Sequence, residues 1–134
     1  MRWLVKEEPD NYDFDQFLSD GATVWSGVKN PVAQKNLRAM QKGDRVFYYH
    51  TGKQKAVIGT ATVTVAAYPD PNDPTGKLVV VEFAPGKKLK RPVTLAEIKA
   101  AGRFPDFPLV RLPRLSVMPV TDAQWEAIEQ MARE

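Results

Sequence analysis

The chain has 134 residues, of which 43% are hydrophobic and 26% charged, and its net charge is +3. This length and composition predict one soluble domain, 1–134, with its own hydrophobic core, and the absence of cysteine excludes disulfides, thiolate metal sites and a cysteine nucleophile. No apolar stretch approaches the ~20 residues that span a bilayer and the first residues lack a signal-peptide core, so we expect a cytoplasmic monomer.

The first expected elements are a buried strand and a short helix. Residues 2–6 are rich in strand-forming apolar residues, and Pro9, which lacks a donor for a sheet, ends them. Asp13 precedes apolar residues at helical spacing and is suited to cap a helix, and Gly21 ends that helix.

A strand, a turn and a helix follow within one short run. Residues 23–25 predict a strand, Ser26 with the next glycine a break, and Asn30 the N-cap of a helix over 31–41. Such a junction places backbone donors, the Trp25 ring and an amide side chain near one another, which is typical of a site for a flat or anionic group. The alternative is that Trp25 belongs to the core and Asn30 is only a cap.

The middle of the chain predicts consecutive strands. Residues 45–50 alternate in a way that sends neighbouring aromatic side chains to opposite faces. Residues 56–67 form a long β-rich run in which Gly59 indicates a bulge or bend. After a proline-rich loop, residues 77–84 predict a central strand.

The last third predicts two capped helices around a short strand. Thr94 and Glu97 form a capping box, Gly102 ends that helix, and residues 115–118 predict a strand. Thr121 opens the final helix with a second capping box. Five or six strands with peripheral helices predict an α+β fold, mostly antiparallel, and the glycine bend favours a small barrel.

The residues that catalysis would need are few. The single histidine, His50, has no cysteine partner, and there is no glycine-rich phosphate loop. Glu7 and Glu8 are adjacent in a strand, so their carboxylates point to opposite faces and cannot act on one bond. We therefore expect a binding protein without cofactor or metal. Two alternatives stay open: an enzyme with His50 as acid or base beside Glu8, and a protein-interaction domain that docks through exposed aromatics.

Aromatic and basic residues favour nucleic acid as the partner. Trp25, Tyr48, Tyr49 and Trp3 offer rigid faces on which a base can stack, an interaction that contributes roughly 1–3 kcal/mol per base. Clustered cations suit backbone phosphates, and they lie at Lys87, Lys88, Lys90, Arg91, Arg111 and Arg114.

Five segments in order resemble the EVE domain, shared with the thymocyte nuclear protein family. They are WLVKEEPD (3–10), WSGVKN (25–30), GDRVFYYH (43–50), KRPVTL (90–95) and RLSVMPV (114–120). The resemblance implies a PUA-like, mostly antiparallel β-barrel of five or six strands with flanking helices, related to YTH and ASCH domains. It also implies binding, without catalysis, of DNA or RNA that carries a modified base.

The resemblance places the base in a pocket between the barrel and the helix after Trp25, with the base stacked on that indole. The residues that it assigns to the pocket are Lys6, Glu7, Glu8, Trp25, Ser26, Asn30, Tyr49, His50 and Ser116. Glu7 stands where the family's first motif commonly has serine. For the phosphates, we select Lys90, Arg91 and Arg114.

Overall fold

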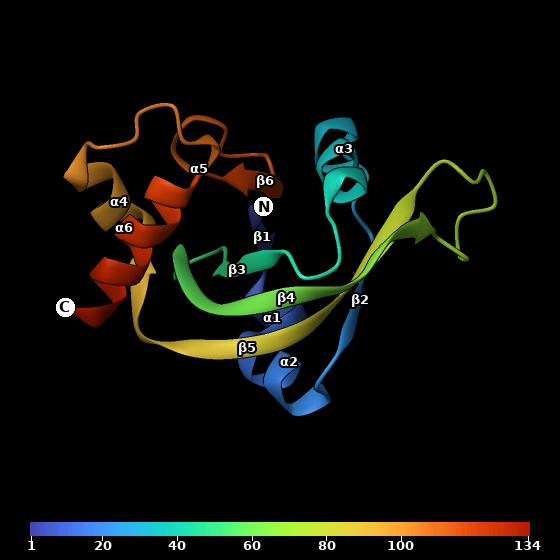
Figure 1. The fold of residues 1–134 in the computed structure, drawn as a ribbon, viewed down its shortest axis with the longest axis horizontal. Helices are drawn as coiled ribbons and strands as arrows, with labels where there is room; N and C mark the ends of the chain where they lie inside the picture. The colour runs from blue at the N-terminus through green and yellow to red at the C-terminus, as the bar shows by residue number, and fades with distance from the viewer.

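The computed structural model describes residues 1–134, and its centre is one six-stranded sheet (Figure 1). The strand order is β2-β5-β4-β3-β1-β6, in which β1 and β3 are parallel and all other neighbours antiparallel. This confirms a mostly antiparallel α+β fold. The strands are β1 (Arg2–Glu7), β2 (Thr23–Trp25), β3 (Arg45–His50), β4 (Ala56–Pro69), β5 (Val79–Thr94) and β6 (Val117–Val120).

The sheet does not close into the expected barrel, and a helix lies between edge strand β6 and the start of β5, beyond the part of β5 that pairs with β2. Helix α3 (Pro31–Ala39) contacts both β6 and β5. The Asn36 amide donates to the Val117 carbonyl at 2.7 Å. Gln34 donates to the Val79 carbonyl at 3.1 Å and accepts from the Val79 amide at 2.9 Å. These side-chain bonds satisfy edge groups that a neighbouring strand would otherwise pair.

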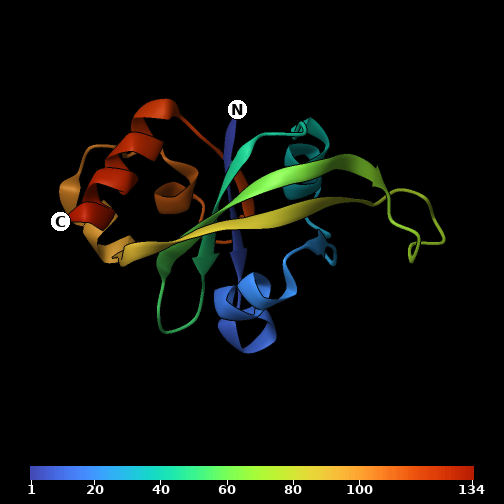
Figure 2. The same ribbon diagram turned by 60° about the horizontal axis from the view of Figure 1, so that its bottom comes forward.

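Strands β4 and β5 are long and strongly bent (Figures 1 and 2), as Gly59 predicted. Their register shifts on both sides of Gly59. A Cβ at this glycine would lie 2.3 Å from the ring of Phe14, so the bend brings an aromatic side chain against bare backbone. Strand β5 runs ten residues beyond the predicted end at Ala84. The proline, glycine and lysines of this extension give no strand pattern in the sequence, but hydrogen bonding to β4 keeps the segment extended.

Six helices flank the sheet, and the predicted caps are confirmed. Asp13 accepts from the Gln16 amide, Gly21 is left-handed, and both capping boxes are formed. The two shortest helices were not predicted. None of the six is long and apolar enough to span a membrane. They are α1 (Pro9–Tyr12), α2 (Phe14–Asp20), α3 (Pro31–Ala39), α4 (Leu95–Ala101), α5 (Pro108–Arg111) and α6 (Asp122–Arg133).

The core has an aromatic cluster on each face of β3. Tyr48 packs against Phe14 and Phe17 of α2 at ring separations of 5.4 and 5.5 Å. Its neighbour Phe47 stacks on Trp125 of α6 at 3.6 Å. The alternation of side chains along β3 thus sets where α2 and α6 dock, and Figure 2 shows these helices well apart.

Candidate nucleic-acid interface

Five of the predicted pocket residues meet at the end of β1. In the parallel pair of β1 and β3, Lys6 lies beside Tyr49 and Glu7 beside His50. The Lys6 amide donates to the Ser116 carbonyl at 2.9 Å, which brings the segment before β6 to the same place. The backbones of these residues meet because three chain segments run side by side, and alternation sends the Lys6 and Tyr49 side chains to one face of the sheet and those of Glu7 and His50 to the other. We call Lys6, Tyr49 and Ser116 the cluster.

Lys6 provides a fixed cation within this cluster. Its ammonium donates to the Pro113 carbonyl at 3.0 Å and lies 5.6 Å from the centre of the Tyr49 ring. Burial lowers the pKa of Lys6, and burial raises the pKa of Tyr49 to about 12. Tyr49 is therefore a neutral phenol at neutral pH, and the Lys6 amino group lies over its ring.

A groove of about 350 Å³ adjoins the cluster, between the start of α3 and the segment before β6. The Asn30 carbonyl oxygen caps α3 by accepting from the Val32 and Ala33 amides at 2.9 and 3.0 Å. Its NH₂ group makes no hydrogen bond within the protein and is free to donate. Arg114 is exposed on the opposite side, and Val32 and Leu112 add exposed apolar walls. An amide donor, a cation and apolar walls suit a flat polar ligand.

The Trp25 ring is not the open stacking face that the sequence predicted. It is only 5% exposed, with Tyr48 edge-on at 5.5 Å and Phe83 at 5.4 Å. No ring face is left for a base in this conformation. The two buried polar side-chain atoms that lack a partner are Thr51 Oγ1 and Trp125 Nε1. The Trp25 N–H also has no partner in the protein, but it is not fully buried, so it keeps some contact with solvent.

His50 is not placed to transfer a proton. It is 5% exposed, and its Nε2 accepts from the Phe14 backbone amide at 3.1 Å. That bond puts the ring proton on Nδ1, which donates to the Gln54 side-chain oxygen at 2.6 Å. Glu8 is exposed at the start of α1, and the Glu7 carboxylate accepts from the Glu8 amide at 2.9 Å. Both ring nitrogens of the only histidine are thus engaged.

The three predicted phosphate contacts do not form one set. The Arg91 guanidinium donates to Glu97 at 2.8 Å and to the Met131 carbonyl at 2.6 Å, so it joins β5 to α4 and α6. Its hydrogen bond is the main cause that lowers the pKa of Glu97. These contacts give Arg91 a structural role between β5, α4 and α6, and its contact with phosphate stays a prediction. Arg114 lies at the groove beside Asn30, and Lys90 lines a different pocket.

Two contributors to this site were not predicted from the sequence. The Pro113 carbonyl orients Lys6, and Leu112 forms part of the groove wall. Both lie in an irregular, proline-containing segment without periodicity, where only the neighbouring Arg114 and Ser116 belonged to a recognisable motif.

The model of the EVE domain family matches residues 1–131 of the chain. The chain belongs to the EVE domain family. An NMR structure of a Rhodopseudomonas palustris protein is 43% identical, with a TM-score of 0.94 over 98% of this chain and 92% of that one. Human thymocyte nuclear protein 1 is 28% identical over 94% of this chain and 71% of its own length.

A crystal structure of the human protein, THYN1, contains DNA with 5-methylcytosine. It is 24% identical to this chain, with a TM-score of 0.91 over 99% of this chain and 98% of that one. A more distant neighbour is an ASCH domain from Zymomonas mobilis, 15% identical, with a TM-score of 0.58 over 97% of this chain and 94% of that one. The PUA-like fold implied by the sequence motifs is thereby confirmed, with a helix rather than strand pairing at the gap in the sheet.

Proposed function

We propose that this EVE domain protein is a DNA-binding module that holds a modified base in the site at the end of β1, without catalysis. The observation that carries the proposal is the THYN1 structure with 5-methylcytosine DNA, because that protein shares the fold over 99% of this chain. DNA is therefore preferred to RNA as the partner, and the cytoplasmic location stays a prediction.

The groove chemistry supports uptake of a base. A base that leaves the stack needs donors for its polar edge and walls for its plane. In the groove the Asn30 amide is an unpaired donor, and Val32 and Leu112 offer apolar contact of the kind that a base methyl group makes. The Trp25 N–H, outside the groove lining, is a second unpaired donor. In this proposal Trp25 contacts the base with its N–H edge rather than with its face.

The two alternatives have less support in the structure. An enzyme with His50 as acid or base would need a free ring nitrogen, and both are hydrogen-bonded. A docking patch of exposed aromatics is contradicted, because the exposed large hydrophobic residues are all aliphatic: Met1, Leu18, Val24, Val32, Val65 and Leu112.

A titration of two duplexes that differ only in one 5-methylcytosine tests the proposal. We expect the wild-type protein to bind the modified duplex more tightly. Asn30→Ser keeps a capping oxygen but removes the amide donor, so the helix should persist while the preference falls by roughly 5-fold or more. Circular dichroism checks that the variant is folded. Equal wild-type affinity for the two duplexes, and for duplexes with other modified bases, would refute modified-base recognition.

A further inference from the structure

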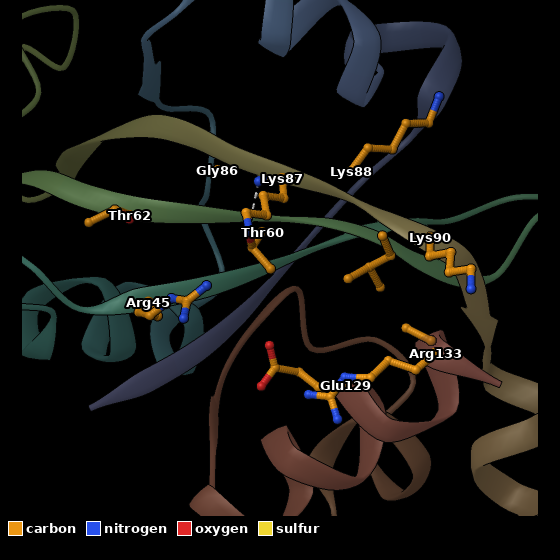
Figure 3. A pocket seen from close by; sticks show the side chains of 11 residues that line it. Arg45, Thr60, Thr62, Gly86, Lys87, Lys88, Lys90, Glu129 and Arg133 are labelled. Atoms are coloured by element: carbon orange, nitrogen blue, oxygen red, sulfur yellow. Dashed lines mark hydrogen bonds between the residues drawn. The ribbon is translucent and has the colours of Figure 1, made fainter.

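A second, larger pocket lies beside α6, and we call it the α6 groove. Its volume is about 710 Å³, and it is formed by the start of β3, the middle of β4, the second half of β5 and the end of α6 (Figure 3). None of the residues assigned to the base site lines it. Its charged and hydroxyl-bearing walls include Arg45, Thr62, Lys87, Lys90, Glu129 and Arg133.

The α6 groove concentrates the positive charge of the chain. Of its five cations, Lys88 points towards α2 in Figure 3 and pairs with Asp15 at 2.9 Å. The other four belong to none of the four ion pairs in the structure. Against the single carboxylate, Glu129, they give the groove a formal charge of +3, which equals that of the whole chain. The rest of the protein is therefore neutral on balance.

The floor of the groove is held open by backbone rather than filled by side chains. The Lys87 amide donates to the Thr60 hydroxyl at 3.0 Å, which fixes β5 against β4. A Cβ at Gly86 would lie 2.5 Å from that hydroxyl, so the two strands approach closely only because this residue is glycine. The Arg45 guanidinium carbon lies 5.3 Å from the centre of the Trp125 ring, which holds this cation at the wall.

The lining favours a chain of phosphates over a nucleotide. Only Leu89 and Ala132 are hydrophobic among the lining residues, and no aromatic ring is available for a base to stack on. Where no aromatic ring is present for a base to stack on, long basic side chains contact the charged phosphates of a nucleic acid and do not distinguish its base sequence.

The groove lies within reach of DNA bound at the base site. Arg45 begins β3 and His50 ends it, so five strand steps, about 17 Å, separate the Cα atom at the groove from the one at the base-site end of β3. Duplex DNA advances about 3.4 Å per base pair, so roughly five base pairs cover this length.

We propose that the α6 groove binds backbone phosphates of the DNA whose modified base occupies the site at the end of β1. This inference rests on the proposed function and assigns different roles to the two sites. The groove supplies salt-dependent affinity that is the same for every sequence, whereas the base site supplies the selection.

The test is the double variant Lys87→Gln/Lys90→Gln, because both side chains are exposed and make no hydrogen bonds. The matched control is Lys77→Gln/Lys99→Gln, which removes the same charge from exposed positions outside the groove. Each protein is titrated, over a range of salt concentrations, with a plain and a modified duplex of roughly 12 base pairs. The free nucleotide 5-methyldeoxycytidine monophosphate serves as a probe that reaches only the base site.

We expect the groove variant to bind both duplexes roughly 10- to 60-fold more weakly at about 0.1 M salt. The slope of log K against log salt should become shallower by about 1.8, since each lost phosphate contact changes it by about 0.9. The ratio of modified to plain affinity and the binding of the nucleotide should not change, and the control should retain the wild-type slope.

Two results would overturn the inference: a salt slope equal to that of the control, or an equal loss of affinity for the nucleotide and the duplex. The second would mean that the groove holds the nucleotide itself. Failure of the proposed function appears separately, as a wild-type protein without preference for the modified duplex. Because the groove variant is also titrated with the plain duplex, the test of phosphate binding is valid whether or not the protein prefers the modified base.

Discussion

Replacing Trp25 separates its structural role from its role in binding. The ring is 5% exposed and packs on Tyr48 and Phe83. Truncation of such a ring to alanine costs about 3–5 kcal/mol of unfolding free energy. Domains of this kind are stable by only ~5–15 kcal/mol, so Trp25→Ala would lose a large part of the total. Urea unfolding followed by circular dichroism measures this loss directly.

Trp25→Phe is the informative variant, because phenylalanine retains a ring for packing but lacks the N–H. We expect a smaller loss of stability, ~1–2 kcal/mol, because fewer buried atoms are removed. If the N–H donates to the base, affinity for the modified duplex should fall roughly 5- to 150-fold, which corresponds to ~1–3 kcal/mol for an acceptor left unpaired. The assay is an anisotropy titration under conditions where both proteins are fully folded.

Two results would refute this reasoning about Trp25. A loss below about 1 kcal/mol for Trp25→Ala would show that the indole does not support the core. Wild-type affinity and preference in Trp25→Phe would show that the N–H edge takes no part in recognition.

Two further predictions concern stability. Gly59→Ala should destabilise the protein by about 1–3 kcal/mol in urea unfolding, since the new Cβ would lie 2.3 Å from the Phe14 ring. The double variant Gly59→Ala/Phe14→Leu should recover part of this loss, because the smaller side chain relieves the clash. Strictly additive losses in the two single variants and the double variant would contradict a steric cause. Burial raises the pKa of Asp44, but hydrogen bonds from the Trp3 indole, the Gln41 amide and the Met1 ammonium outweigh burial and leave that pKa below its usual value. Because the folded-state pKa is the lower one, Asp44 stabilises the fold above the unfolded value of about 3.9, and this contribution is lost as pH falls through the folded-state pKa. Unfolding free energies measured from about pH 6 down to about pH 2 should therefore fall less steeply for Asp44→Asn than for wild type, and parallel curves would contradict the assignment.

Local patterns predicted the ends of most elements. The N-caps at Asp13 and Asn30, and the boxes opened by Thr94 and Thr121, formed as expected. Strand β3 has its predicted bounds. A cap requires only a side chain and a backbone amide within three residues, so the amino-acid order alone contains this information.

The candidate site was predictable as a set of motifs but not as a surface. Lys6, Tyr49 and Ser116 do meet, and the register of β1, β3 and β6 decides that meeting. The sequence could not show that Arg91 is engaged by Glu97 and Met131, because one of these partners lies forty residues away. Family motifs indicate candidate residues, whereas long-range contacts decide which of their side chains remain free to bind.

The sequence by itself therefore determined the α+β class, the helix caps, the bend at Gly59 and membership of the EVE family. Only the tertiary structure decided that the gap in the sheet is filled by α3, that Trp25 is buried, and that Arg45 joins Lys87, Lys90 and Arg133 in one groove. The physical reason is the range of the forces involved. Caps and turns depend on neighbours along the chain, while burial and charge clustering depend on how distant segments pack.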